Sequence, residues 1–104
     1  MSGYGPANWT PSTDPSWQQA RNIAIVGVGA ASVDDALVVA ILEYLESTGQ
    51  QAEAAATHNA STSAWNAGQR GWTDDTRRSF EDATDAYLRL VDAVIAAVRP
   101  ELRA

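Results

Sequence analysis

The sequence contains neither cysteine nor lysine and has little positive charge. Without cysteine the chain has no disulfide framework, no thiolate metal site and no cysteine nucleophile. The net charge of −6 disfavours binding to nucleic acid or to an anionic membrane surface, because both require patches of basic side chains. All seven basic residues are arginine, and together with the many alanines this indicates a GC-rich coding bias, as in actinobacteria.

A long uninterrupted apolar run is also missing. The longest apolar stretch, residues 23–45, is broken by Ser32, Asp34 and Asp35, so it falls short of the roughly 20 residues that a membrane span needs. The first 15 residues lack the basic and apolar regions of a secretory signal peptide. We therefore expect no membrane span and a location that is cytoplasmic, or outside the cell by export without a cleaved leader.

The length of 104 residues and the 45% apolar content fit a single small globular domain. Residues 1–13 include Pro6 and Pro11 and are expected to form a flexible N-terminal arm. Residues 14–104 are expected to form one helical domain. Because a chain of this size buries a modest core, oligomerisation is a common source of additional stability.

Helix signals divide the first 60 residues into two segments. Thr13 or Asp14 is a suitable N-cap before Pro15, and the helix that follows is predicted to loosen at Gly27 and Gly29. Ser32 is predicted to cap a second helix that extends to about residue 60, with Gly49 as a weak point or a break. The first half of this second helix is apolar on nearly all sides, which favours contacts in more than one direction.

A third helix is the clearest element of the sequence. Residues 61–72 are rich in serine and glycine and are predicted to form a loop, after which Thr73 caps a helix that ends before Pro100. The sequence therefore predicts an all-α fold: an antiparallel helical hairpin with an additional N-terminal helix, completed to a bundle in a homodimer. The predicted helix carries a heptad-like apolar stripe, namely Phe80, Ala83, Tyr87, Leu90, Val94 and Ala97.

Three patterns in the sequence resemble chemical sites. Residues 23–32 resemble the opening of a dinucleotide-binding fold, but Ser32 replaces the third glycine and no second strand follows, so a helix end is favoured. His58 has no acidic residue three or four positions before it, which disfavours a helical metal site. The adjacent aspartates at 34–35 and 74–75 fall in first helical turns, where they complement the helix dipole. We expect no cofactor, no metal and no catalytic residue.

The four tryptophans are the most informative residues. Trp9 and Trp17 flank the start of the first helix, and Trp65 and Trp72 flank the predicted loop. They could close the two ends of a small core, anchor a protein partner, or line a pocket for a small apolar ligand. The candidate partner-binding residues are Trp9, Trp17, Trp65, Trp72 and Tyr87.

The segment from Trp65 to Gly68, between two predicted helices in an alanine-rich, acidic chain of about 100 residues, resembles the WXG100 proteins of type VII secretion. The resemblance covers about residues 33–98. It implies a helical hairpin that dimerises and leaves the cell without a cleaved leader. The motif here is Trp-x-x-Gly instead of Trp-x-Gly, and Tyr87 is followed four positions later by Val91 instead of an acidic residue.

These observations favour a non-enzymatic helical protein–protein interaction module, with a homo-oligomer or another helical protein as partner and with a secretion-associated role of the WXG100 type. Two alternatives stay open. One is a small oligomeric helical enzyme or ligand-binding protein with a tryptophan-lined pocket. The other is an assembly protein of a phage or similar particle, in which the arm around Trp9 docks.

Overall fold

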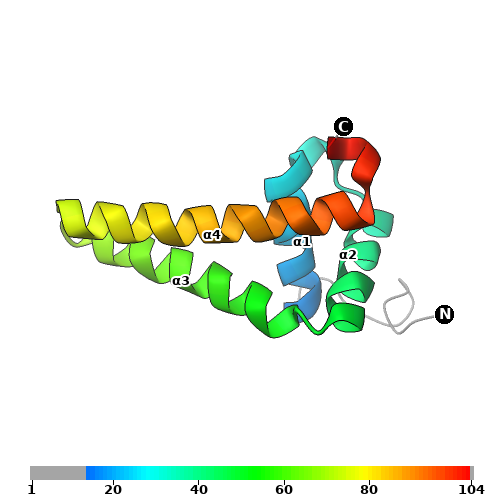
Figure 1. The fold of residues 1–104 in the computed structure, drawn as a ribbon, viewed down its shortest axis with the longest axis horizontal. Coiled ribbons are helices and arrows are strands. Elements are labelled where there is room, and N and C mark those ends of the chain that lie inside the picture. Colours follow the sequence, from blue (N-terminus) through cyan, green and yellow to red (C-terminus); the bar gives the residue numbers. More distant parts are fainter. Residues whose placement is uncertain (1–13, 104) are drawn as a thin grey trace.

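The structure, a computed structural model, describes residues 14–103, which are mainly helical and contain no strand. The all-α fold is confirmed. The predicted N-terminal arm, with Trp9, lies outside the described residues. In order, the elements are α1 (Pro15–Val28), the short 3₁₀ helix η1 (Ala30–Ser32), α2 (Asp35–Thr48), α3 (Gln51–Gln69), α4 (Asp74–Val98) and the 3₁₀ helix η2 (Pro100–Arg103) (Figure 1).

Helix α1 begins at one of the two caps predicted for it, Asp14. The Asp14 carboxylate accepts hydrogen bonds from the backbone N–H groups of Ser16 at 2.9 Å and Trp17 at 3.3 Å, which satisfies donors that have no partner within the helix. The helix continues past Gly27 and ends at Gly29, whose φ of 89° is accessible to glycine at little energetic penalty.

Helix α2 begins at another residue than the one predicted and ends at Gly49, where a weak point or a break was predicted. Its N-cap is Asp34, whose side chain accepts a hydrogen bond from the N–H of Leu37 at 2.7 Å, whereas Ser32 lies in η1. The predicted cap at Ser32 was therefore wrong. Gly49 adopts a left-handed conformation with φ 70° and ends the helix, so the single long helix predicted from 32 to about 60 is divided into α2 and α3.

The loop predicted over residues 61–72 was also wrong, because α3 extends to Gln69 and the connection to α4 is limited to residues 70–73. Small side chains such as Ser61, Ala64 and Gly68 occur along this segment, and they allow α3 to lie against α4. Thr73 caps α4 as predicted: it accepts from the N–H of Thr76 at 3.2 Å, and the Thr76 hydroxyl accepts from the N–H of Thr73 at 2.7 Å.

The helices form two regions along one axis. Helices α3 and α4 make an antiparallel hairpin, and α1 and α2 pack at one end of it, so that the outer part of the hairpin projects beyond them (Figure 1). The predicted hairpin is thus formed by α3 with α4, and α2 folds back as a separate element. Two helices pack on the hairpin within one chain, where the sequence had predicted one; completion of a bundle by a second copy stays a prediction.

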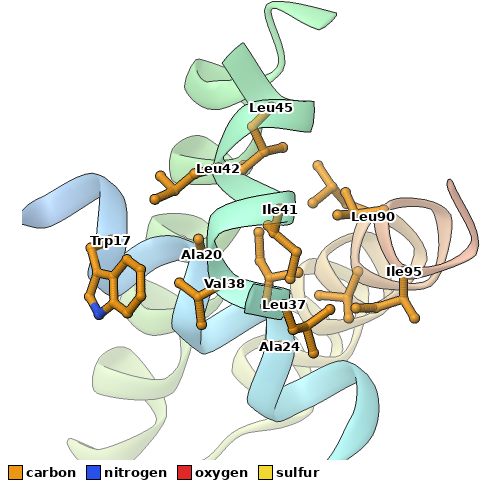
Figure 2. Packing of buried hydrophobic residues seen from close by; sticks show 14 of the residues in the cluster. Trp17, Ala20, Ala24, Leu37, Val38, Ile41, Leu42, Leu45, Leu90 and Ile95 are labelled. Atoms are coloured by element: carbon orange, nitrogen blue, oxygen red, sulfur yellow. The ribbon is translucent and has the colours of Figure 1, made fainter. Parts of the chain in front are cut away.

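The core lies where α1 and α2 meet the C-terminal half of α4 (Figure 2). Gly27 of α1 faces α4 there: a Cβ at this position would lie 2.6 Å from Cγ1 of Ile95, so the close approach of the two helices depends on the missing side chain. The buried side chains are Trp17, Ala20, Ile23 and Ala24 from α1, Leu37, Val38, Ile41, Leu42 and Leu45 from α2, Ala54 from α3, and Tyr87, Leu90, Val91, Val94 and Ile95 from α4.

Candidate functional site

The outer part of the α3–α4 hairpin, residues 58–86, has almost no core of its own, and we call it the projection. Between residues 55 and 86 the one buried residue is Gly68. All other side chains there are half-buried or exposed. A helical segment that buries so little is stabilised by a few pairwise contacts between its two helices.

These contacts follow a regular register. The ring of His58 lies 5.5 Å, centroid to centroid, from that of Tyr87, at the boundary with the core. Further out, the hydroxyl groups of Ser61 and Thr84 are hydrogen-bonded at 3.1 Å. Both pairs are placed symmetrically about the junction between residues 72 and 73, as expected for an antiparallel hairpin that turns there. We call this line of contacts between α3 and α4, which includes His58 with Tyr87 and Ser61 with Thr84, the seam, and it is partly polar.

Three aromatic rings close the end of the projection, and we call Trp65, Trp72 and Phe80 the aromatic cluster. The ring centroids of Trp65 lie 5.5 Å from those of both Trp72 and Phe80, and Trp72 lies 5.8 Å from Phe80. The interplanar angles of 52–72° are edge-to-face or tilted arrangements, which suit the quadrupoles of aromatic rings.

The aromatic cluster is only partly covered. Trp65 is 47% exposed and Trp72 is 39% exposed, while Phe80 is half-buried between them. Gly68 lies under Trp72, and a Cβ at Gly68 would overlap the indole ring. The absence of a side chain at Gly68 therefore allows the Trp72 ring to approach α3 closely. The result is an apolar surface at the end of the molecule furthest from the core.

The structure brings together two of the predicted partner-binding residues and separates the others. Trp65 and Trp72 share the aromatic cluster, whereas Trp17 is 2% exposed and lies in the core. Trp17 is thus buried within the single folded chain, and its role in partner binding stays a prediction. Tyr87 is 6% exposed and belongs to the core boundary. Trp9 is outside the described residues.

Phe80 is the site residue that sequence reasoning placed elsewhere, in the apolar stripe of the third helix. The signal that could have found it is the hairpin register. Trp65 and Phe80 are equally distant from the junction of residues 72 and 73, as His58 and Tyr87 are. The predicted loop over residues 61–72 concealed this relation, because it removed Trp65 from a helix.

Tyr87 combines burial with an unsatisfied polar group. Its hydroxyl is buried and has no hydrogen-bond partner. Burial raises the pKa of the phenol above its usual value, because desolvation penalises the phenolate. The ring packs against His58, so the hydroxyl adds a polar penalty to an otherwise favourable aromatic contact.

Two cavities of the described residues have no tryptophan in their lining. One, of about 230 Å³, lies where α1, α2 and the start of α3 meet, and a groove of about 360 Å³ runs between α3 and α4 near the core. Among the described residues that line these two sites there is no tryptophan, so neither is the tryptophan-lined pocket considered from the sequence. The first is lined by Pro15, Ser16, Gln19, Leu42, Leu45, Gln51 and Ala55.

The remaining candidate groups have structural positions. Asp34 caps α2, and Asp35, Asp74 and Asp75 lie in first helical turns. Within residues 14–103 no three side chains of the metal-binding types gather as a ligand set. In the same range, no helix has the length and apolar content to cross a membrane. Comparisons of the chain with protein-family models, with curated proteins and with solved structures gave no match.

Proposed function

We propose that the protein is a non-enzymatic helical interaction module that docks on a protein partner through the aromatic cluster. The observation that carries the proposal is the partial exposure of Trp65 and Trp72 side by side at the end of the projection. Tryptophan is the residue type most enriched among interface residues that dominate binding energy. The edge-to-face packing holds the rings in place before a partner arrives, which lowers the entropy lost on binding.

The exposed parts of the two indoles are large enough to matter. A tryptophan buries on the order of 200 Å², so covering the exposed halves of two rings removes roughly 200 Å² from water. At about 25 cal/mol per Å² this contributes about 5 kcal/mol before the entropy of association is subtracted. The cluster can therefore anchor an interface, but additional contacts along the projection are needed for stable binding.

Helix α3 supplies a surface for those contacts. Residues 54–69 contain no charged side chain, and this is the longest uncharged stretch of the chain. A second helix can lie along small, uncharged side chains at short distance and without like-charge repulsion. A second copy of this chain also carries a net charge of −6, and residues 54–69 contain no negative charge that would repel it. A homodimer is accordingly one form of the proposed assembly, and another helical protein is the other.

A secretion-associated role of the WXG100 type is the specific form of this proposal. It is supported by the antiparallel pairing of α3 with α4 and by the position of Trp65 near the turn between them. The segment from Trp65 to Gly68 lies in the last turns of α3 and not in the connection itself. Export without a cleaved leader would follow from that role.

The test is quantitative capture of partners by tagged full-length chain in its native cells, together with sedimentation of the purified protein over a range of concentrations. Trp65→Ser should abolish both the retained partner and any self-association. Val26→Ser is the matched control, because Val26 is 44% exposed on α1, away from the projection, and its loss should change neither. Retention unaffected by Trp65→Ser, or lost equally in both variants, would contradict the proposal.

A further inference from the structure

We infer that the projection opens and closes as a separate unit while the core stays folded, and that the aromatic cluster is the clasp that keeps it closed. The inference goes beyond docking, because it concerns a conformational equilibrium that exists with or without a partner. It rests on three features of the described residues: the distribution of burial, the weakness of the seam, and the position of the clasp.

The distribution of burial separates the projection from the core. Cooperative unfolding couples two regions when they share buried surface. Every large, fully buried side chain of the described residues lies in α1, α2 or the C-terminal part of α4, and none lies between residues 55 and 86. Opening the projection therefore exposes none of the large, fully buried side chains, and it uncovers the core at its boundary, at Tyr87.

The seam of the projection is weak on its own. The outer half of α3 is rich in Ser, Thr, Asn and Gly, which have lower helix propensity than Ala or Leu. A helical segment of about a dozen residues is marginally stable in water without tertiary contacts. Its contacts across the seam include a single hydroxyl pair, Ser61 with Thr84, and the boundary contact of His58 with Tyr87. Neither contact buries a large apolar area.

The clasp lies at the turn end of the projection, where it has the largest effect on opening. Trp65 belongs to α3, Phe80 to α4, and Trp72 to the connection, so the cluster joins both helices and the turn. The capping box of Thr73 and Thr76 fixes the start of α4 beside it. With the cluster formed, the two helices are held at the turn and at the core. Without it, the turn end is held by the connection alone.

The boundary of the opening unit lies at Tyr87. On its C-terminal side α4 is packed into the core, and on its N-terminal side α4 is exposed apart from the seam. Opening would give the buried Tyr87 hydroxyl access to water, which removes its unsatisfied state. This favours opening at the same place where the burial pattern changes.

Native-state hydrogen exchange of the full-length chain, measured by NMR at increasing low concentrations of denaturant, tests the inference. Amides of the projection, such as that of Ser63, should exchange through a local opening with a small denaturant dependence, and those of Ile41 and Val94 through global unfolding. Trp72→Ala should lower protection in the projection by roughly tenfold or more, since two ring contacts are lost, and should leave core amides unchanged. Val26→Ala is the control and should leave the projection unchanged.

The inference is overturned if the amides of Ser63 and Ile41 exchange with the same protection and the same denaturant dependence, or if Trp72→Ala lowers protection equally in both regions. Gly68→Ala provides a second variant, because its methyl group displaces the Trp72 ring while both tryptophans are retained. It should lower protection within residues 58–86 only, and an unchanged exchange pattern in Gly68→Ala would count against the clasp.

Discussion

The two halves of α4 belong to the same helix and yet meet opposite conditions. From Tyr87 to Val98 the helix contributes to the core with α1 and α2, and from Asp74 to Ala86 it meets α3, the connection between the two helices, and solvent. Secondary structure is continuous across the boundary, but buried surface is not. Helicity and stability therefore have different origins in α4. Capping and helix propensity define the whole helix, whereas packing in the core stabilises only its C-terminal half.

The core end should respond most strongly to loss of buried volume. Ile41→Ala removes a fully buried side chain at the centre of the core and should lower the free energy of unfolding by about 3–4 kcal/mol, measured by urea denaturation. Leu88→Ala on α4, where the side chain is 41% exposed, should cost less than about 1 kcal/mol. Similar losses in the free energy of unfolding for the two variants would contradict the difference in buried surface between the two sites.

The same substitution can be made at a glycine in each region. Gly27→Ala places a methyl group 2.6 Å from Cγ1 of Ile95 inside the core, and should destabilise the protein by about 1–2 kcal/mol despite the better helix propensity of alanine. Gly68→Ala meets the Trp72 ring, which is partly exposed and can move aside. Global stability should change there by less than about 0.5 kcal/mol. Thermal denaturation of both variants measures this difference, and an equal loss of stability in both would contradict it.

The boundary residue Tyr87 offers a test with a pH dependence. Tyr87→Phe removes a buried hydroxyl without a hydrogen-bond partner and should stabilise the fold by up to about 1 kcal/mol at neutral pH. Because the pKa of Tyr87 is raised in the folded state, its contribution is present below the pKa of the unfolded phenol and is lost as the pH rises through the folded value.

The Tyr87→Phe variant should therefore lose less stability than the parent between neutral pH and roughly pH 11. Tyr44→Phe, at a half-buried position on α2, is the matched control. Thermal melts of the three proteins across this pH range make the measurement. An equal alkaline loss in the parent and in Tyr87→Phe would contradict the role assigned to burial.

The smallest effect is expected at the cap of α4. Thr73→Ala removes the hydrogen bond from the N–H of Thr76 and should destabilise the first turns by about 0.5–1 kcal/mol. If the projection opens separately, this loss should be seen in the hydrogen exchange of the projection and only weakly in global unfolding. Ser79→Ala, at an exposed position on the same helix, controls for the change of side chain. A full loss in global stability would show that the two regions unfold together.

The sequence alone determined those helix ends that depend on residues close by in the chain. Asp14 was one of two predicted caps for the first helix, Thr73 was the predicted cap of the third, and that helix was predicted to stop before Pro100. Each of these features acts within one helical turn. The all-α class followed from the same signals. Of the candidate site, Trp65 and Trp72 were predicted as a pair on either side of a turn, because both lie close to it in the chain.

Tertiary structure decided what depends on residues far apart. Gly27, Gly29 and Gly49 are equivalent as local signals, yet Gly27 continues a helix against Ile95 while the other two end helices at positive φ. Trp17 and Trp65 are both helical tryptophans, and only the arrangement of α1 on α2 and α4 buries the first and leaves the second exposed. Capping acts over three or four residues, whereas burial depends on which helices meet, and that is a property of the packed chain.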